Sequence, residues 1–209
     1  MIPMKICNSL SEIQVEEKLV LTIGNFDGVH LGHLDLLSQT KTFAKKFNAK
    51  IAVMTFSPHP MMILGNTKER FLLTSLEKKR ELLSQAGIDY LIEINFNRDL
   101  STLSPLDFLK RHVLISQNLK ALFLGFNFSF GAKKSGTHEV VSDILKSLGS
   151  PVELQVANPF IMNGEIISSS KIRSALDTGN VILAAKFLSR PHALRGLVVK
   201  GDGRGRTIG

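Results

Sequence analysis

Residues 19–33 run LVLTIGNFDGVHLGH, and this stretch decides the fold. The apolar residues 19–24 predict a buried strand, and residues 32–47 predict a helix. Gly24 and Gly28 allow a tight turn between them, because glycine adopts backbone angles that other residues avoid. A strand that turns directly into a helix is typical of α/β proteins that bind anions at the helix start.

The rest of the chain repeats this alternation of strand and helix. The sequence predicts further strands at residues 51–56, 90–94, 120–124 and 152–156. It predicts further helices at residues 76–86, 105–113, 139–148, 170–177 and 181–188. The strands are apolar without interruption, which is typical of parallel strands covered on both faces. We therefore expect an α/β fold with a doubly wound parallel sheet, similar to Rossmann folds.

The strand-to-helix loops of such a sheet lie at one edge, where ligands bind. His30 and His33 stand at the start of the first predicted helix and share a face. Two imidazoles beside the unpaired N–H groups of a helix start are suited to phosphate oxygens, and Gly32 leaves room for a flat base. A plainer interpretation is that both histidines are only polar residues at a helix start. A metal site is a further alternative, but a nearby third ligand of the usual type is lacking.

Two more segments follow the second and fourth strands. Residues 56–60, FSPHP, place His59 between two prolines, which also fits a rigid turn with an exposed histidine. Residues 125–131, GFNFSFG, carry phenylalanines at every second position, which also fits a simple buried strand end.

A last segment, residues 167–173, reads ISSSKIR and opens a helix. Serine is a preferred N-cap, so capping alone would explain the serines. Arg173, one turn into the helix, and Lys171, beside its N-terminal dipole, add two cations that can bind phosphates.

The run Gly-x-Phe-Asp-Gly-x-His-x-Gly-His at residues 24–33 resembles the signature of nucleotidyltransferases related to class I aminoacyl-tRNA synthetases. Its form is similar to that of the bacterial bifunctional riboflavin kinase/FAD synthetase family, and the three later segments match that family in order. The resemblance implies transfer of AMP from ATP to FMN with Mg²⁺, giving FAD and pyrophosphate. Two positions depart from the family pattern: Phe126, where an acidic residue is common, and Ser129, where Arg is usual.

The residues and the resemblance together give a set of expected site residues. We expect catalytic roles for His30, His33 and Arg173. We expect nucleotide contacts from Gly24, Asn25, Phe26, Asp27, Gly28, Gly32, His59, Pro60, Ser169 and Ser170. We expect acceptor contacts from Asn127, Phe128, Phe130 and Gly131, and we predict no metal ligand among the side chains.

Composition limits the partners. Lys and Arg number 26 against 18 Asp and Glu, a formal net charge of +8, which favours anionic partners. No Trp and one Tyr argue against nucleic acid, because stacking platforms for bases are scarce. No apolar run reaches the roughly 18–20 residues that span a bilayer. The lone Cys7 cannot form an internal disulfide, so we expect a cytoplasmic protein, and a homo-oligomer stays open.

The final residues resemble the opening of a second domain. Residues 194–200 predict a strand, and residues 201–209 form a Gly/Arg turn similar to the start of the family's riboflavin kinase domain. We therefore expect an FMN adenylyltransferase domain at residues 1–188 and a truncated kinase opening at 189–209, without kinase activity from these residues.

Two other functions stay open at this stage. One is a related nucleotidyltransferase with another phosphorylated acceptor, which Phe126 and Ser129 favour. The other is a nucleotide- or flavin-binding protein without turnover.

Overall fold

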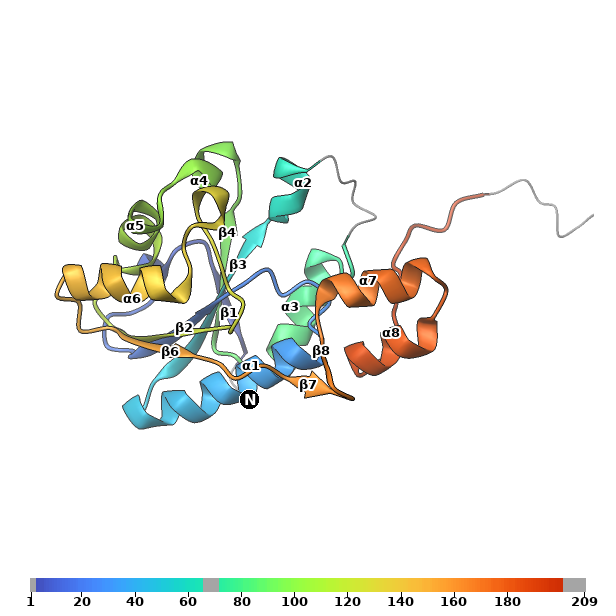
Figure 1. Cartoon of the computed structure of the whole chain (residues 1–209), viewed down its shortest axis with the longest axis horizontal. Helices are drawn as coiled ribbons and strands as arrows, with labels where there is room; N and C mark the ends of the chain where they lie inside the picture. The colour runs from blue at the N-terminus through green and yellow to red at the C-terminus, as the bar shows by residue number, and fades with distance from the viewer. Residues whose placement is uncertain (1–2, 66–71, 201–209) are drawn as a thin grey trace, which may run out of the picture.

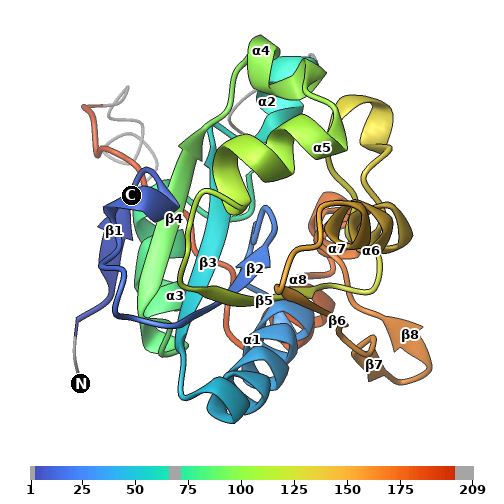
Figure 2. The same ribbon diagram turned by 90° about the vertical axis from the view of Figure 1, so that its left-hand side faces the viewer.

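The computed structural model describes residues 3–65 and 72–200. Its centre is a six-stranded sheet in the order β1-β4-β3-β2-β5-β6, and every neighbouring pair is parallel (Figure 2). The strands are β1 (Lys5–Cys7), β2 (Leu19–Ile23), β3 (Lys50–Ser57), β4 (Tyr90–Asn95), β5 (Leu119–Leu124) and β6 (Glu153–Val156). The predicted doubly wound parallel sheet is thus confirmed.

Helices cover both faces of this sheet. One face packs against α1 (Leu31–Ala44) and α3 (Leu76–Gln85), which cover Val20, Val53 and Leu91. The opposite face packs against α5 (Pro105–Phe108), the π-helical turn η4 (Leu109–Val113) and α6 (His138–Ser147). Because alternate residues of a strand point to opposite faces, two helical layers explain why β2, β3, β4 and β5 are buried along most of their length, whereas the edge strand β6 alternates between exposed and half-buried residues.

Short elements complete the chain around these layers. They are η1 (Leu10–Glu12), η2 (Lys45–Phe47), α2 (Pro60–Leu64), α4 (Arg98–Thr102), η5 (Ala132–Lys134) and the antiparallel hairpin of β7 (Ile161–Met162) and β8 (Glu165–Ile166). The last two helices, α7 (Ser169–Asp177) and α8 (Val181–Leu188), lie side by side at one end of the molecule (Figure 1). They form a third apolar cluster with Leu73 and Ile167.

The order of the strands creates a switch point at β2. From β2 the chain moves through β3 to β4 on one side, and β5 then returns to pair with β2 on the other side. The loops after β2 and β5 therefore separate at the carboxyl ends of these strands, which is where open α/β sheets bind ligands. Both loops carry predicted site residues.

The structure differs from the sequence prediction in its short elements. The sequence analysis missed β1, the β7–β8 hairpin, α2 and α4, which have only two to five residues each and too little periodicity to detect. The predicted helix at 105–113 is divided into α5 and η4.

The predicted strand at residues 194–200 is wrong in this structure, which assigns them neither helix nor strand. A strand is stable only when its backbone groups pair with a neighbouring strand, and the described sheet ends at β1 and β6. The predicted Gly/Arg turn at 201–209 lies outside the described residues.

Candidate active site

The loop between β2 and α1 turns sharply under the carboxyl edge of the sheet. Phe26, Gly28 and Val29 have φ angles of 49°, 83° and 38°, all in the left-handed region. Glycine adopts this region freely, whereas the two other side chains must be held there by their surroundings. Both are fully buried, Phe26 at 1% and Val29 at 0% exposed, so packing against the core fixes the turn.

Asp27 ties this loop to two distant parts of the chain. Its carboxylate accepts hydrogen bonds from the backbone N–H groups of Leu73 (3.0 Å) and Thr74 (3.3 Å), which precede α3. It also forms a buried ion pair with Arg173 of α7, while the Ser169 hydroxyl donates to the Asp27 carbonyl at 2.9 Å. The start of α7 is therefore held directly against the loop.

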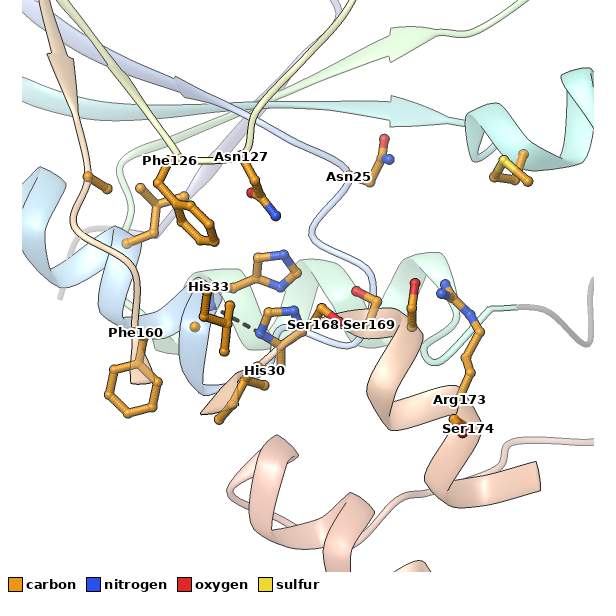
Figure 3. Close-up of a pocket in the computed structure, with 18 of the residues that line it drawn as sticks. Asn25, His30, His33, Phe126, Asn127, Phe160, Ser168, Ser169, Arg173 and Ser174 are labelled. Atoms are coloured by element: carbon orange, nitrogen blue, oxygen red, sulfur yellow. Dashed lines mark hydrogen bonds between the residues drawn. The ribbon is translucent and has the colours of Figure 1, made fainter. Parts of the chain in front are cut away.

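The two histidines stack at the start of α1. Their ring centroids lie 3.7 Å apart with an interplanar angle of 14°. The backbone N–H of His33 donates to His30 Nδ1 at 3.3 Å (Figure 3). Because Nδ1 of His30 accepts, a neutral imidazole there carries its proton on Nε2. Burial lowers the pKa of His30 to about 4, with Arg190 and Arg173 adding to the effect, and burial also lowers the pKa of His33. Both rings are therefore neutral hydrogen-bond donors at neutral pH.

A cavity of about 690 Å³ opens above these histidines. Figure 3 shows Phe126 and Phe160 at one end, the two histidines in the middle and Arg173 at the other end. The serines at the start of α7 line the cavity between the histidines and Arg173. One elongated space thus has an aromatic end and a cationic, hydroxyl-rich end, which matches a base followed by a chain of phosphates.

A second cavity of about 410 Å³ adjoins the first and has a more apolar lining. Its walls include Phe56, Phe96 and Phe108 from the sheet edge and α5, and Phe128 and Phe130 from the loop after β5. Phe108 and Phe130 pack with their centroids 4.9 Å apart, and Phe128 stacks on Phe130 at 5.4 Å. Such a cluster of rings is suited to a flat aromatic ligand.

The two cavities share a polar boundary. Asn25, His33, Asn127, Lys134 and Ser169 line both of them. In Figure 3 the Asn127 side chain points toward the histidines from the opposite wall. Ligands in the two cavities would therefore meet beside His33, among donors for negatively charged groups.

The structure brings most of the predicted residues to these cavities. The larger cavity is lined by Asn25, His30, Gly32, His33, His59, Asn127, Ser169, Ser170 and Arg173. The smaller cavity is lined by Gly24, Asn25, Phe26, Pro60, Asn127, Phe128, Phe130 and Gly131. Asp27 and Gly28 line neither, and the direct nucleotide contacts predicted for them stay predictions. Both instead act within the protein: Asp27 binds Arg173, and the Gly28 N–H donates to the Thr74 hydroxyl at 3.2 Å.

His59 has a structural contact as well as a place in the larger cavity. Its Nδ1 accepts from the Met61 N–H at 3.1 Å and so caps α2. Burial lowers the pKa of His59 to about 4, against the opposing effect of Asp27.

Comparison with known proteins agrees with this geometry. The sequence profile of the FAD synthetase family matches residues 12–171, which include β2, β3, β5 and the first turn of α7. The chain belongs to the FAD synthetase family. This match spans most of the described sheet and most of the residues that line both cavities, and it ends two residues before Arg173.

Curated relatives of this FAD synthetase family member are longer than the chain. It is 37% identical over 195 residues to the bifunctional riboflavin kinase/FMN adenylyltransferase of Bacillus subtilis, covering 93% of this chain and 60% of the relative. It is 36% identical over 194 residues to the protein of the same description from Escherichia coli K12, covering 93% and 61%. The chain therefore spans about three fifths of the length of these relatives.

Solved structures extend the comparison. The crystal structure of a macrolide-efflux protein from Streptococcus pneumoniae matches with a TM-score of 0.81 and 29% identity over the whole of this chain and 66% of that one. Thermotoga maritima TmcAL, solved with α-thio ATP, matches with a TM-score of 0.53 and 12% identity over 81% of this chain and 52% of that one, which shows a shared fold. Among residues 3–65 and 72–200, no helix is long and apolar enough to span a bilayer.

In and around the two cavities lie residues that the sequence analysis missed. Phe160, next to the β7–β8 hairpin, closes the aromatic end of the larger cavity. Lys79 of α3 and Arg190, just after α8, donate to backbone carbonyls of residues 25–29, the candidate nucleotide loop (below, the nucleotide loop). Lys79 lies in an ordinary amphipathic helix, and nothing in its local pattern distinguishes it from Lys78. Only the packing of α3 against the loop reveals its place.

Proposed function

We propose that the chain transfers AMP from ATP to FMN, giving FAD and pyrophosphate. The observation that carries this proposal is the pair of adjoining cavities, one aromatic at one end and cationic at the other, the second lined by phenylalanines, with a shared polar boundary. Such an arrangement holds two substrates whose reacting phosphates meet at the boundary. The family profile and the names of the bifunctional relatives support the same activity.

ATP occupies the larger cavity in this proposal. Its adenine lies between Phe126 and Phe160, above Gly32, where a Cβ would approach the His30 ring to 3.3 Å and reduce the space. Its phosphates run past His30 and His33 toward Ser170 and Arg173. The guanidinium of Arg173 already lies on the loop through Asp27, so it meets the departing pyrophosphate with little reorganisation.

FMN occupies the smaller cavity, with its ring against the phenylalanines and its phosphate at the boundary. A phosphate oxygen of FMN forms a bond to the α-phosphorus of ATP as the bond from that phosphorus to the bridging β-oxygen breaks. Pyrophosphate leaves with the electron pair of the broken bond. No protein nucleophile is needed, so catalysis consists of positioning and charge stabilisation. The Nε2–H of neutral His30, and an N–H of the neutral His33 ring, would donate to the α-phosphate oxygens.

Mg²⁺ fits the donors of the larger cavity. Asn25, Asn127, Ser169 and the Asp177 carboxylate offer the hard oxygen atoms that this ion prefers. Within the described part of the chain no group of three His, Cys, Asp or Glu residues could hold a metal by itself. The ion would therefore depend largely on the substrate phosphates, whose charge it would neutralise.

The longer relatives support a proposal for the rest of the chain. We infer that residues 1–188 form the adenylyltransferase domain and that residues 189–209 begin the part that corresponds to riboflavin kinase in those relatives. Arg190 lies beyond this boundary, yet its guanidinium donates to the Val29 carbonyl at 3.1 Å. The packing of the first domain therefore extends at least to Arg190.

A second candidate is a nucleotidyltransferase with another phosphorylated acceptor. Ser129, where the family usually has Arg, lines the smaller cavity and leaves it without that charge. One experiment separates these activities: purified chain is incubated with ATP, Mg²⁺ and either FMN or another phosphorylated acceptor, and FAD and pyrophosphate are measured. FMN-dependent release in equal amounts supports the proposal. Release with another acceptor only, or FMN binding without release, contradicts it.

A further inference from the structure

The carbonyl oxygens of the nucleotide loop are all occupied by donors from the protein. The Phe26 carbonyl accepts from the Val29 N–H at 3.3 Å, and the Asp27 carbonyl accepts from the Ser169 hydroxyl at 2.9 Å. The carbonyls of Asn25, Gly28 and Val29 accept from charged side chains. A carbonyl oxygen repels phosphate, so a loop beside bound phosphates must direct its carbonyls elsewhere.

Lys79 holds the first of these carbonyls. Its Nζ donates to the Asn25 carbonyl at 3.1 Å, and the Thr55 hydroxyl donates to the same oxygen at 3.1 Å. The side chain reaches the loop from α3 and is only 6% exposed. Burial lowers the pKa of Lys79, and the charges of Asp27 and Glu93 oppose that effect. A buried cation is costly, which makes a purely stabilising role a poor explanation for this lysine.

Arg190 holds the other end of the loop. Its guanidinium donates to the carbonyls of Gly28 and Val29, the latter at 3.1 Å, and to that of Leu188 at 2.9 Å. The planar guanidinium spans several acceptors at once, which an ammonium group cannot do in the same geometry. Arg190 thereby fixes the turn that leads into His30 from the side of α8.

We propose that Lys79 and Arg190 are positioning residues of the ATP site: they hold the carbonyls of Asn25, Gly28 and Val29 away from the site and so fix the turn that presents Asn25 and His30 to the larger cavity. Neither residue lines the two cavities. Their positive charges would also attract the triphosphate of ATP across the loop. This inference rests on the proposed ATP site, but not on the identity of the acceptor.

The test is ATP binding by folded variants. The substitution Lys79→Met keeps the length of the side chain and removes its charge, and Lys78→Met is the matched control. Lys78 is the adjacent residue of α3, and its exposed ammonium pairs with Glu81 at 2.7 Å. Affinity is measured by calorimetry with an ATP analogue that has a methylene bridge between its α- and β-phosphates, and folding is monitored by circular dichroism. FMN affinity is measured separately by flavin fluorescence.

We expect Lys79→Met to weaken binding of the analogue about 10–100-fold, because a carbonyl loses its charged donor. FMN affinity should stay within about twofold, and the melting temperature should not fall, since methionine is at least as compatible with a buried position. Lys78→Met should leave all three quantities unchanged. Analogue affinity within about twofold of wild type in folded Lys79→Met would overturn the inference.

Further variants cover the case in which Lys79→Met does not fold. Thr55→Val removes the other donor to the Asn25 carbonyl and should weaken the analogue by a smaller factor. Arg190→Lys keeps the positive charge but loses the planar set of N–H donors, so it should also weaken binding of the analogue. Arg195→Gln, at an exposed position, is the control. Normal analogue binding in both Thr55→Val and Arg190→Lys would equally overturn the inference. A wild-type chain that binds the analogue but makes no FAD would contradict the proposed function and leave this inference standing.

Discussion

The nucleotide loop, residues 25–29, and the loop after β5, residues 125–131, lie at the same edge of the sheet but are held in place by different contacts. Every carbonyl from Asn25 to Val29 accepts a hydrogen bond from the protein, and the loop is anchored by buried charges. The loop after β5 is held by backbone hydrogen bonds, including two between Phe130 and Gly136 (3.2 and 2.9 Å), and by the packing of rings around Phe130. In the proposed reaction, electrostatic contacts would therefore position ATP, and the shape of the ring-lined cavity would position FMN.

If this comparison is correct, the largest loss of turnover comes from the stacked histidines. His30→Ala and His33→Ala should each lower kcat about 10²–10³-fold, because each removes a preorganised donor beside the reacting phosphate. The measurement is FAD formation from FMN and ATP. His138→Ala on α6, whose side chain is 36% exposed, is the control and should leave the rate unchanged. Near-normal rates in both active-site variants would refute the assignment.

The next largest effect should come from the link between the loop and α7. Asp27→Asn removes the buried partner of Arg173, so we expect a rate about 10²-fold lower because the guanidinium is misplaced. The free energy of unfolding should also fall by about 3 kcal/mol or more, as measured in urea. Glu165→Gln is the matched control, because Glu165 of β8 forms an exposed ion pair of 2.9 Å with Lys171, which lies on α7 like Arg173.

Equal losses in Asp27→Asn and Glu165→Gln would show that a general loss of charge, rather than the buried link, reduces the rate.

A smaller and more selective effect should follow in the acceptor cavity. Phe128→Ala removes one ring of the stacked pair, so we expect the KM for FMN to rise about tenfold while the KM for ATP changes little. Steady-state kinetics with each substrate varied in turn provide the measurement. Phe47→Ala controls for a general loss of aromatic packing, because it removes a half-buried ring that packs on Phe43 and lines neither cavity. A rise in both KM values would contradict the separation of the two regions.

The smallest effect on turnover should be that of mild acid. The pKa of His30 is about 4 in the folded chain and about 6.5 when unfolded, so the unfolded state binds more protons between these values. The contribution of this imidazole to the free energy of unfolding should therefore be fully present above about pH 6.5. It should be lost as the pH falls toward 4, a decrease of about 3 kcal/mol. The rate should show no inflection from His30 between pH 8 and 5.5. Melting temperatures and kcat/KM across this range test both statements.

An inflection of kcat/KM near pH 6.5 that His30→Ala removes would show that the imidazole works in its charged form.

Much of the fold was predictable because its signal is local. Five of the six predicted strands and the long helices were confirmed, since apolar runs and helical periodicity report burial directly. The β7–β8 hairpin was missed because its strands have only two residues each, and β1 because it is short and pairs with the distant β4. The predicted strand at residues 194–200 failed because it has β-forming residues but no partner strand among the described residues.

The sequence by itself determined the chemistry of the nucleotide loop, because glycines, two histidines and a helix start lie within residues 24–33. It also determined the sheet edge at which the other polar segments meet, since parallel strands share one carboxyl edge. Only the tertiary structure decided that Asp27 holds Arg173, and that Lys79 and Arg190 hold the loop from below. These contacts join residues 54 to 161 positions apart, and only the packing of α3, α7 and α8 around the loop brings them together.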